Sequence, residues 1–203
     1  MSQPVNVSGF ESYRGVMAYG LPLTFMKSNL NLNADIGYTI NPGIINNSEN
    51  KSRTYSGGAG FVLSSNISER IDFTLSNNIN INKVTNSLQR QLNDTYQIYR
   101  GSFRFTWTTK KGFILDNDLN YQQYNGLGSE FDQRFTLWNA AVGHTFFKDR
   151  TEIKLNVFDI LNQNNSISRS VETNYIQDMR NTSLGRYFLL SFTYYLKNFK
   201  SKS

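Results

Sequence analysis

Strict alternation of apolar and polar residues runs through most of this chain and constrains its fold more than any other feature. In the segment Asn29–Ile40, one set of alternate positions reads Leu, Leu, Ala, Ile, Tyr, Ile and the other reads Asn, Asn, Asn, Asp, Gly, Thr. Successive side chains of a β-strand point to opposite faces, so this pattern predicts a strand with one apolar and one polar face.

The alternation recurs often enough to predict about nine strands. They are Tyr13–Phe25, Asn29–Ile40, Tyr55–Asn66, Ile71–Asn82, Tyr96–Trp107, Phe113–Tyr124, Phe135–Phe146, Thr151–Phe158 and Arg186–Asn198. We expect short connections at residues 26–27, 67–70, 109–112 and 147–150, and long ones at 41–53, 84–95, 125–132 and 161–181. Such a sequence of short and long connections is typical of an antiparallel meander with tight turns at one end and large loops at the other.

Composition excludes several classes of protein. The 203-residue chain has no cysteine, which excludes disulfide scaffolds, zinc fingers, iron–sulfur centres and thiol enzymes, and its single histidine, His144, makes most histidine-based metal sites and triads impossible. No cofactor, metal or enzymatic activity is expected. The net charge of +6 is compatible with nucleic-acid binding, but many lysines and arginines fall in expected turns, so no nucleic-acid partner is predicted.

Two architectures share this pattern, because the apolar face can form the core of a soluble barrel or meet lipid in a membrane barrel. Predicted strands of about 11–13 residues exceed the usual ~5–6 of soluble sheets and suit the ~9–11 that span a bilayer. The polar positions carry amides and hydroxyls with few charges, as a barrel lumen does. The sequence therefore predicts an all-β, antiparallel transmembrane β-barrel.

The strand count indicates an incomplete barrel. Nine strands is an odd number, whereas bacterial single-chain barrels have even numbers, and residues 1–20 lack a signal-peptide pattern. We therefore expect residues 1–203 to form a single domain, the C-terminal segment of a larger barrel, without a plug domain. Short turns are periplasmic in such barrels, which predicts a periplasmic C-terminus.

Several segments carry a family resemblance. The landmarks are VFDILNQN (Val157–Asn164), Tyr175-Ile176 and RYFLLSFTYYL (Arg186–Leu196), with FTLWNAAVG (Phe135–Gly143) and LSSNISERIDFTLS (Leu63–Ser76) upstream. Together they resemble the C-terminal part of outer-membrane β-barrels of the TonB-dependent-receptor type. The resemblance implies a Gram-negative outer membrane, nutrient uptake and contact with lipopolysaccharide and the barrel-assembly machinery. Such receptors have ~22 strands around a plugged lumen, so the rest of the barrel and its plug are expected partners; the ligand is not identified.

Charged residues at polar positions of neighbouring strands are candidate lumen residues. If Lys110-Lys111 is the turn centre, Arg104 lies opposite or diagonal to Asp116 or Asp118. The candidates are Arg100, Arg104, Asp116, Asp118, Glu152 and Lys154. They form either an ion-pair network that fixes the wall or docks a plug, or a patch that steers a ligand.

Two further sets of candidates lie near the C-terminus. In the expected loop 161–181, Arg169, Tyr175 and Arg180 are candidates for contacting a ligand or lipopolysaccharide phosphates, unless the loop is a solvated lid. The last strand is a candidate assembly signal through Phe188, Phe192, Tyr194 and Phe199, although Phe199 is out of phase with the other three. His144 shares the apolar phase near a turn, which predicts a position at the lipid headgroups and no catalytic role.

Two alternatives remain open on the sequence alone. A small standalone outer-membrane barrel with a structural or adhesion role would need eight strands and a misassigned first strand. A soluble antiparallel barrel would turn the same apolar faces inward and bind a small apolar ligand.

Overall fold

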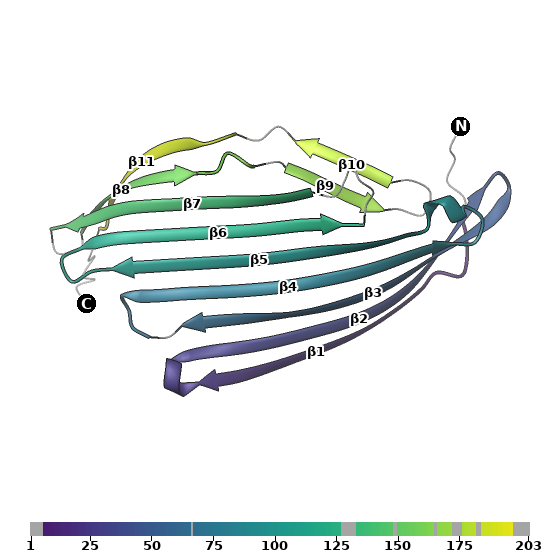
Figure 1. Ribbon diagram of the computed structural model, residues 1–203, viewed down its shortest axis with the longest axis horizontal. Coiled ribbons are helices and arrows are strands. Elements are labelled where there is room, and N and C mark those ends of the chain that lie inside the picture. Colours follow the sequence, from purple (N-terminus) through teal and green to yellow (C-terminus); the bar gives the residue numbers. More distant parts are fainter. Residues whose placement is uncertain are drawn as a thin grey trace, which may run out of the picture.

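Nine antiparallel strands form one sheet, in which β11 follows β8 and every other strand pairs with its neighbours in sequence (Figure 1). The computed structural model describes residues 6–65, 67–126, 133–147, 150–164, 166–171, 176–181 and 184–196. The strands are β1 (Glu11–Leu23), β2 (Ser28–Ile45), β3 (Ser48–Ser65), β4 (Ile71–Asn86), β5 (Asp94–Thr108), β6 (Phe113–Asn125), β7 (Gln133–Phe146), β8 (Thr151–Phe158) and β11 (Tyr187–Tyr194). The predicted all-β meander of nine strands is confirmed.

The smaller elements lie in the connections. Two short 3-10 helices, η1 (Thr24–Met26) and η2 (Arg90–Leu92), follow β1 and β4. Strands β9 (Ser166–Val171) and β10 (Ile176–Asn181) pair with each other in a separate two-stranded sheet. Within the described part of the chain, no helix is long and apolar enough to cross a bilayer, a finding that says nothing about a β-barrel.

One of the predicted long connections is wrong. Residues 41–53 are not a loop, because β2 and β3 continue through them to a two-residue turn at Asn46 and Asn47. Both asparagines have positive φ angles, 49° and 62°, which suit the turn that joins twisted antiparallel strands and which asparagine tolerates better than most residues. The predicted loop 161–181 contains the β9–β10 hairpin.

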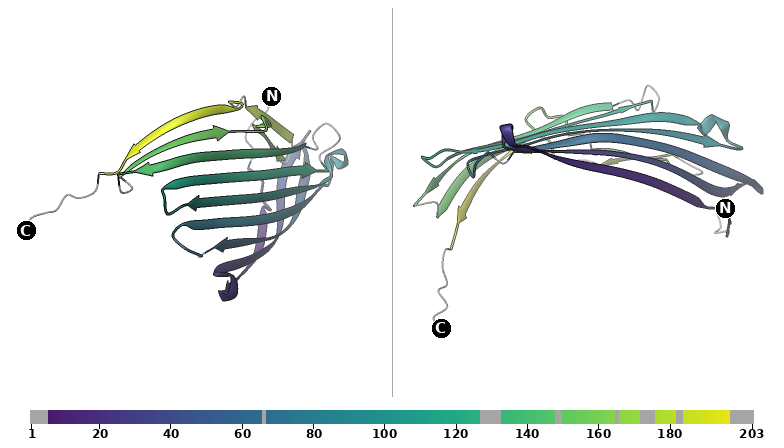
Figure 2. Two further views of the ribbon diagram at one scale, coloured as in Figure 1. Left: turned by 60° about the vertical axis from the view of Figure 1, so that its left-hand side comes forward. Right: turned by 90° about the horizontal axis from the view of Figure 1, so that it is seen from below.

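The sheet has one apolar face and one polar face, and almost no apolar core. Among the described residues only Val84, Ile114 and Ala141 are buried hydrophobic residues. On β4 the apolar Leu75 and Ile79 are exposed, whereas the polar Asn78 and Asn80, which flank Ile79 and point to the other face, are half-buried. Figure 2 shows that the sheet is curved. Because side chains crowd together on the inner side of a curve, we assign the polar face to the inner side and the apolar face to the outer side.

The apolar face has an edge toward the end of the sheet where β2 joins β3. This edge shifts by two residues from each strand to the next. The first polar residues beyond it on β3 to β6 are Arg53, Lys83, Gln97 and Gln123. Each of the last three lies opposite the last apolar-face residue of the preceding strand, namely Tyr55, Ile81 and Tyr99. At about 3.3 Å per residue and ~4.8 Å between strands, this offset corresponds to a strand tilt of roughly 50°, near the ~45° of membrane-spanning strands.

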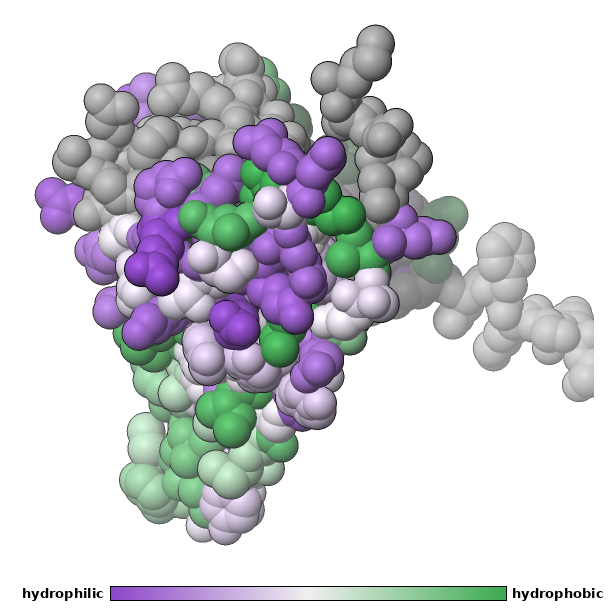
Figure 3. Space-filling model, turned by 90° about the vertical axis from the view of Figure 1, so that its right-hand side faces the viewer, coloured by the Kyte–Doolittle hydropathy of each residue, from purple (hydrophilic) through white to green (hydrophobic). Residues whose placement is uncertain are grey.

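The two ends of the sheet differ. The connections of β2–β3, β4–β5, β6–β7 and β8–β11 lie at one end, called here the loop end, and the remaining connections lie at the other, the turn end. Figure 3 looks onto the loop end, where hydrophilic residues gather. Because β2 and β3 each have 18 residues and ~9–11 suffice to span a bilayer, their hairpin extends well beyond the apolar face at this end.

Candidate functional site: a charged cluster on the polar face

A charged cluster crosses three strands of the polar face. Its centre is Lys154 on β8, whose Nζ lies 2.9 Å from Oδ2 of Asp116 on β6 and 3.0 Å from Oε1 of Glu152 on its own strand. The side chains are largely shielded, with relative exposures of 20% for Lys154, 32% for Asp116 and 17% for Glu152. One ammonium group therefore neutralises part of the charge of two carboxylates in a poorly solvated place.

Small residues on β7 allow Lys154 to reach a strand that is not its neighbour. In the register, Gly143 lies between Ile114 and Lys154, and Ala141 lies between Asp116 and Asn156. A Cβ atom added at Gly143 would come within 2.8 Å of the carbonyl oxygen of Ile153 and 3.3 Å of Cβ of Lys154. The absence of side-chain bulk at these two positions opens the path from β8 across β7 to β6.

A second ion pair is weaker and more exposed. Arg104 lies directly opposite Asp118, and its Nη2 is 3.7 Å from Oδ2 of that carboxylate. The Arg104 side chain is 71% exposed, so the pair contributes at most a fraction of a kcal/mol. Asn120 also donates a hydrogen bond of 2.7 Å to Asp118. Arg100 lies between Asn78 and Gln122 in the register and forms no ion pair within the described part of the chain.

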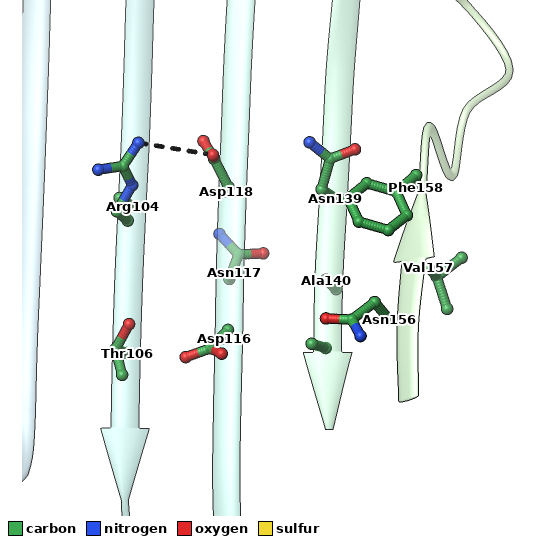
Figure 4. A pocket seen from close by; sticks show the side chains of 11 residues that line it. Arg104, Thr106, Asp116, Asn117, Asp118, Asn139, Ala140, Asn156, Val157 and Phe158 are labelled. Atoms are coloured by element: carbon green, nitrogen blue, oxygen red, sulfur yellow. Dashed lines mark ion pairs between the residues drawn. The ribbon is translucent and has the colours of Figure 1, made fainter. Parts of the chain in front are cut away.

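A shallow hollow of about 310 Å³ lies beside these pairs (Figure 4). Its lining includes Arg104, Thr106, Asp116, Asp118, Asn139, Asn156 and Phe158. These groups offer carboxylate, amide and hydroxyl oxygens together with amide and guanidinium donors. Such a surface suits hydrogen bonding to a polar solute or a polar polypeptide.

The comparison with protein families decides what kind of wall this is. A family model described as the outer membrane protein beta-barrel family matches residues 10–194. The chain belongs to this family. No curated protein and no solved structure matches it.

Family membership assigns environments to the two faces of the sheet. In outer-membrane barrels the apolar face meets lipid and the polar face lines the lumen, so the Lys154 cluster belongs to the lumen wall. The alternative of a soluble barrel with an apolar interior is not favoured. His144 fits the lipid-facing assignment, because its ring contacts those of Phe113 and Phe146, with centroids 4.6 and 4.5 Å away.

Removing Lys154 should destabilise the barrel wall. In Lys154→Met, the Asp116 and Glu152 carboxylates lose their common cation, and because they are only partly buried we expect a loss of about 1–3 kcal/mol. Urea unfolding followed by the fluorescence of Trp107 and Trp138 measures it. Adding Asp116→Asn to Lys154→Met should restore part of the lost stability.

The control is Arg100→Met, which removes a lumen-facing cation without an ion pair in the described part of the chain. It should change stability by less than ~0.5 kcal/mol. Equal losses in Lys154→Met and Arg100→Met would contradict a specific role for the cluster.

The other predicted site residues do not join the cluster. Phe188, Phe192 and Tyr194 of β11 lie on the apolar face in phase with one another and are 67, 68 and 54% exposed. Arg169 on β9 lies opposite Asp178, and Arg180 on β10 opposite Ile167, in the separate hairpin. Tyr175 and Phe199 lie outside the described residues.

Asp159 is a structural residue that the sequence interpretation did not single out. It is 2% exposed, and its carboxylate accepts hydrogen bonds from the backbone N–H groups of Gln163 (2.9 Å) and Asn164 (3.1 Å). Its own N–H donates to Oδ1 of Asn139 on β7. The available signal was an aspartate just beyond a strand and followed by a polar run, since aspartate side chains often close such turns.

Proposed function

We propose that this chain forms the C-terminal wall of an outer-membrane receptor of the TonB-dependent type, which takes up a nutrient through its lumen. The proposal rests on the family membership, on the motif resemblance of Val157–Leu196 and on the geometry of the sheet. In this role the protein performs no covalent chemistry. It provides a lipid-embedded wall, a polar lumen surface and ligand-facing connections.

The observation that carries the proposal is the state of the two edge strands. β1 pairs only with β2, and β11 pairs only with β8, within the described part of the chain. Eight successive antiparallel strand pairs lead from β1 to β11. Because the direction reverses an even number of times, β1 and β11 run in the same direction. Lipid-embedded sheets need closed edges, and antiparallel closure here needs an odd number of additional strands. A larger barrel supplies them, with an even total.

The direction of the wall follows from its connections: three of the four at the loop end are longer than any at the turn end, and the fourth, the β2–β3 turn, closes a hairpin that extends beyond the apolar face. Short turns face the periplasm in outer-membrane barrels, so we propose that the turn end and the C-terminus are periplasmic and that the loop end faces outward. In this orientation the β9–β10 hairpin, with Arg169 and Arg180, is on the ligand side. It leaves β11, whose aromatic residues face lipid, as the strand offered to the barrel-assembly machinery.

The mass of the native polypeptide tests the proposal. An antibody against the segment Tyr187–Phe199 is used on separated cell fractions. We expect a product several times heavier than 23.4 kDa in the outer membrane, with its remaining sequence supplying the plug and the missing strands. A 23.4 kDa product in that membrane would instead indicate a small standalone barrel, and one in a soluble fraction would contradict both.

A further inference from the structure

Two cations lie side by side where the apolar face ends at the loop end. Arg53 follows the apolar-face positions of β3, and Lys83 follows those of β4. Lys83 lies opposite Tyr55, and Arg53 lies opposite Thr85, so the two cations are diagonal neighbours on the apolar face. Diagonal neighbours on adjacent strands are ~7–8 Å apart, a gap that two long side chains close around a single anion.

The described residues supply no counter-charge to either cation. Within the described part of the chain, neither the Arg53 nor the Lys83 side chain forms an ion pair. Nearby, Lys51 is already neutralised, because its Nζ lies 3.3 Å from Oε1 of Glu49. Glu11, level with Arg53 but two strands away, lies near the hydroxyl of Tyr13. The pair therefore leaves two positive charges unmatched on a surface that faces lipid headgroups.

A row of tyrosines on the apolar face leads up to the cations. Tyr13, Tyr38 and Tyr55 occupy one row of the register, which continues to Lys83. The rings of Tyr38 and Tyr55 are in contact, with centroids 4.9 Å apart. Tyrosines mark the interface of the bilayer in barrels, and Tyr55 is the last apolar-face residue of β3 before Arg53, so the cations lie at headgroup height.

We propose that Arg53 and Lys83 together bind a phosphate group of lipid A, the anchor of lipopolysaccharide in the outer leaflet. Arginine offers a planar fork of donors that matches phosphate, and lysine adds a point charge. The row of tyrosines provides an apolar surface for the acyl chains below that phosphate. The inference rests on the outward direction proposed for the loop end, since that direction determines which leaflet the pair meets.

A titration with lipid A tests the site itself. The native polypeptide that carries these residues is extracted in nonionic detergent, and its binding of bisphosphorylated lipid A is measured by native mass spectrometry. We expect R53Q/K83Q to raise the Kd about thirtyfold, because each cation near an anionic lipid contributes a several-fold factor. R53K should retain most of the affinity. Removing the phosphates from lipid A should weaken binding to the wild-type protein as much as the double substitution does.

The matched control is Arg14→Gln. Arg14 lies one residue from the tyrosine row but on the polar face, so its loss should change the Kd by less than twofold. An equal effect of R14Q would overturn the proposal, because it would indicate general charge attraction. Equal affinity of the wild-type protein for phosphatidylglycerol would overturn the assignment to lipid A. A variant that keeps the heat-induced shift in SDS gel mobility is folded, and only such variants are compared.

Surface labelling separates an error in direction from an error in the site. The printed chain has no cysteine, so Leu88→Cys at the loop end and Lys110→Cys at the turn end introduce single labels into it. In intact cells a membrane-impermeant maleimide should modify the cysteine at position 88 and not that at 110. The reverse result would overturn the direction of the wall, and with it the leaflet, whereas the detergent titration is independent of direction.

Discussion

Arginine in place of Leu75 or Phe105 should prevent stable insertion of the wall into a bilayer. Leu75 lies near the middle of the apolar positions of β4, and Phe105 lies near the middle of those of β5. A lysine or arginine facing lipid at the bilayer midplane costs about 2–4 kcal/mol. The double variant is therefore expected to lose several kcal/mol, a large part of the stability of most proteins. Refolding into lipid vesicles, followed by urea titration, measures the loss.

Thr106→Arg is the matched control for Phe105→Arg. It introduces the same charge one residue away, on the polar face, between Asp72 and Asp116 in the register. In the lumen, flanked by two carboxylates, that charge should change stability by less than ~1 kcal/mol. If F105R inserted normally while T106R failed, the two faces of the sheet would be assigned the wrong way round.

Asp159→Ala should produce the second large effect. The carboxylate is buried and accepts hydrogen bonds from two partly buried backbone N–H groups, and a polar group that loses its partner costs about 1–3 kcal/mol where water does not reach it. We expect a loss of about 2–5 kcal/mol in urea unfolding. Trypsin should also cleave the variant faster after Arg169 or Arg180, because the turn that leads into this segment loses its closure.

Two further substitutions make the Asp159 prediction specific. Asp159→Asn keeps one side-chain oxygen as an acceptor and should fall between the wild-type protein and the alanine variant. Asp72→Ala removes an exposed aspartate that accepts a hydrogen bond from Ser65 and should cost less than ~1 kcal/mol. A loss in D72A as large as that in D159A would show that burial of the carboxylate has no special role.

The sequence predicts strands and faces well because both follow from a local period of two residues. It predicts pairing only where a turn sets the register, as for Arg104, which lies opposite Asp118 across the Thr109–Gly112 turn. The contact between Lys154 and Asp116 could not be predicted this way, because its partners are two strands apart and depend on the small side chains of β7.

Connections were the least predictable part. Residues 41–53 contain proline, glycine and several asparagines, which usually indicate a loop, yet they extend β2 and β3 because ladder hydrogen bonds continue to the Asn46-Asn47 turn. Asp159 was equally difficult to single out, since a buried aspartate that closes a turn and a solvated one look alike in sequence. Only the surrounding β7 backbone and Asn139 distinguish them.

The order of pairing in the sheet has a kinetic consequence. Seven of its eight strand contacts join neighbours in sequence, so each hairpin closes over a short connection with a small loss of chain entropy. Contacts between segments close in sequence form fast. The exception is β8 with β11, which must wait for the intervening β9–β10 segment to be arranged. We therefore expect the arrival of the last strand to be the slowest pairing step of this wall, and the Asp159 turn, which directs the chain as it leaves β8, to affect the rate of that step.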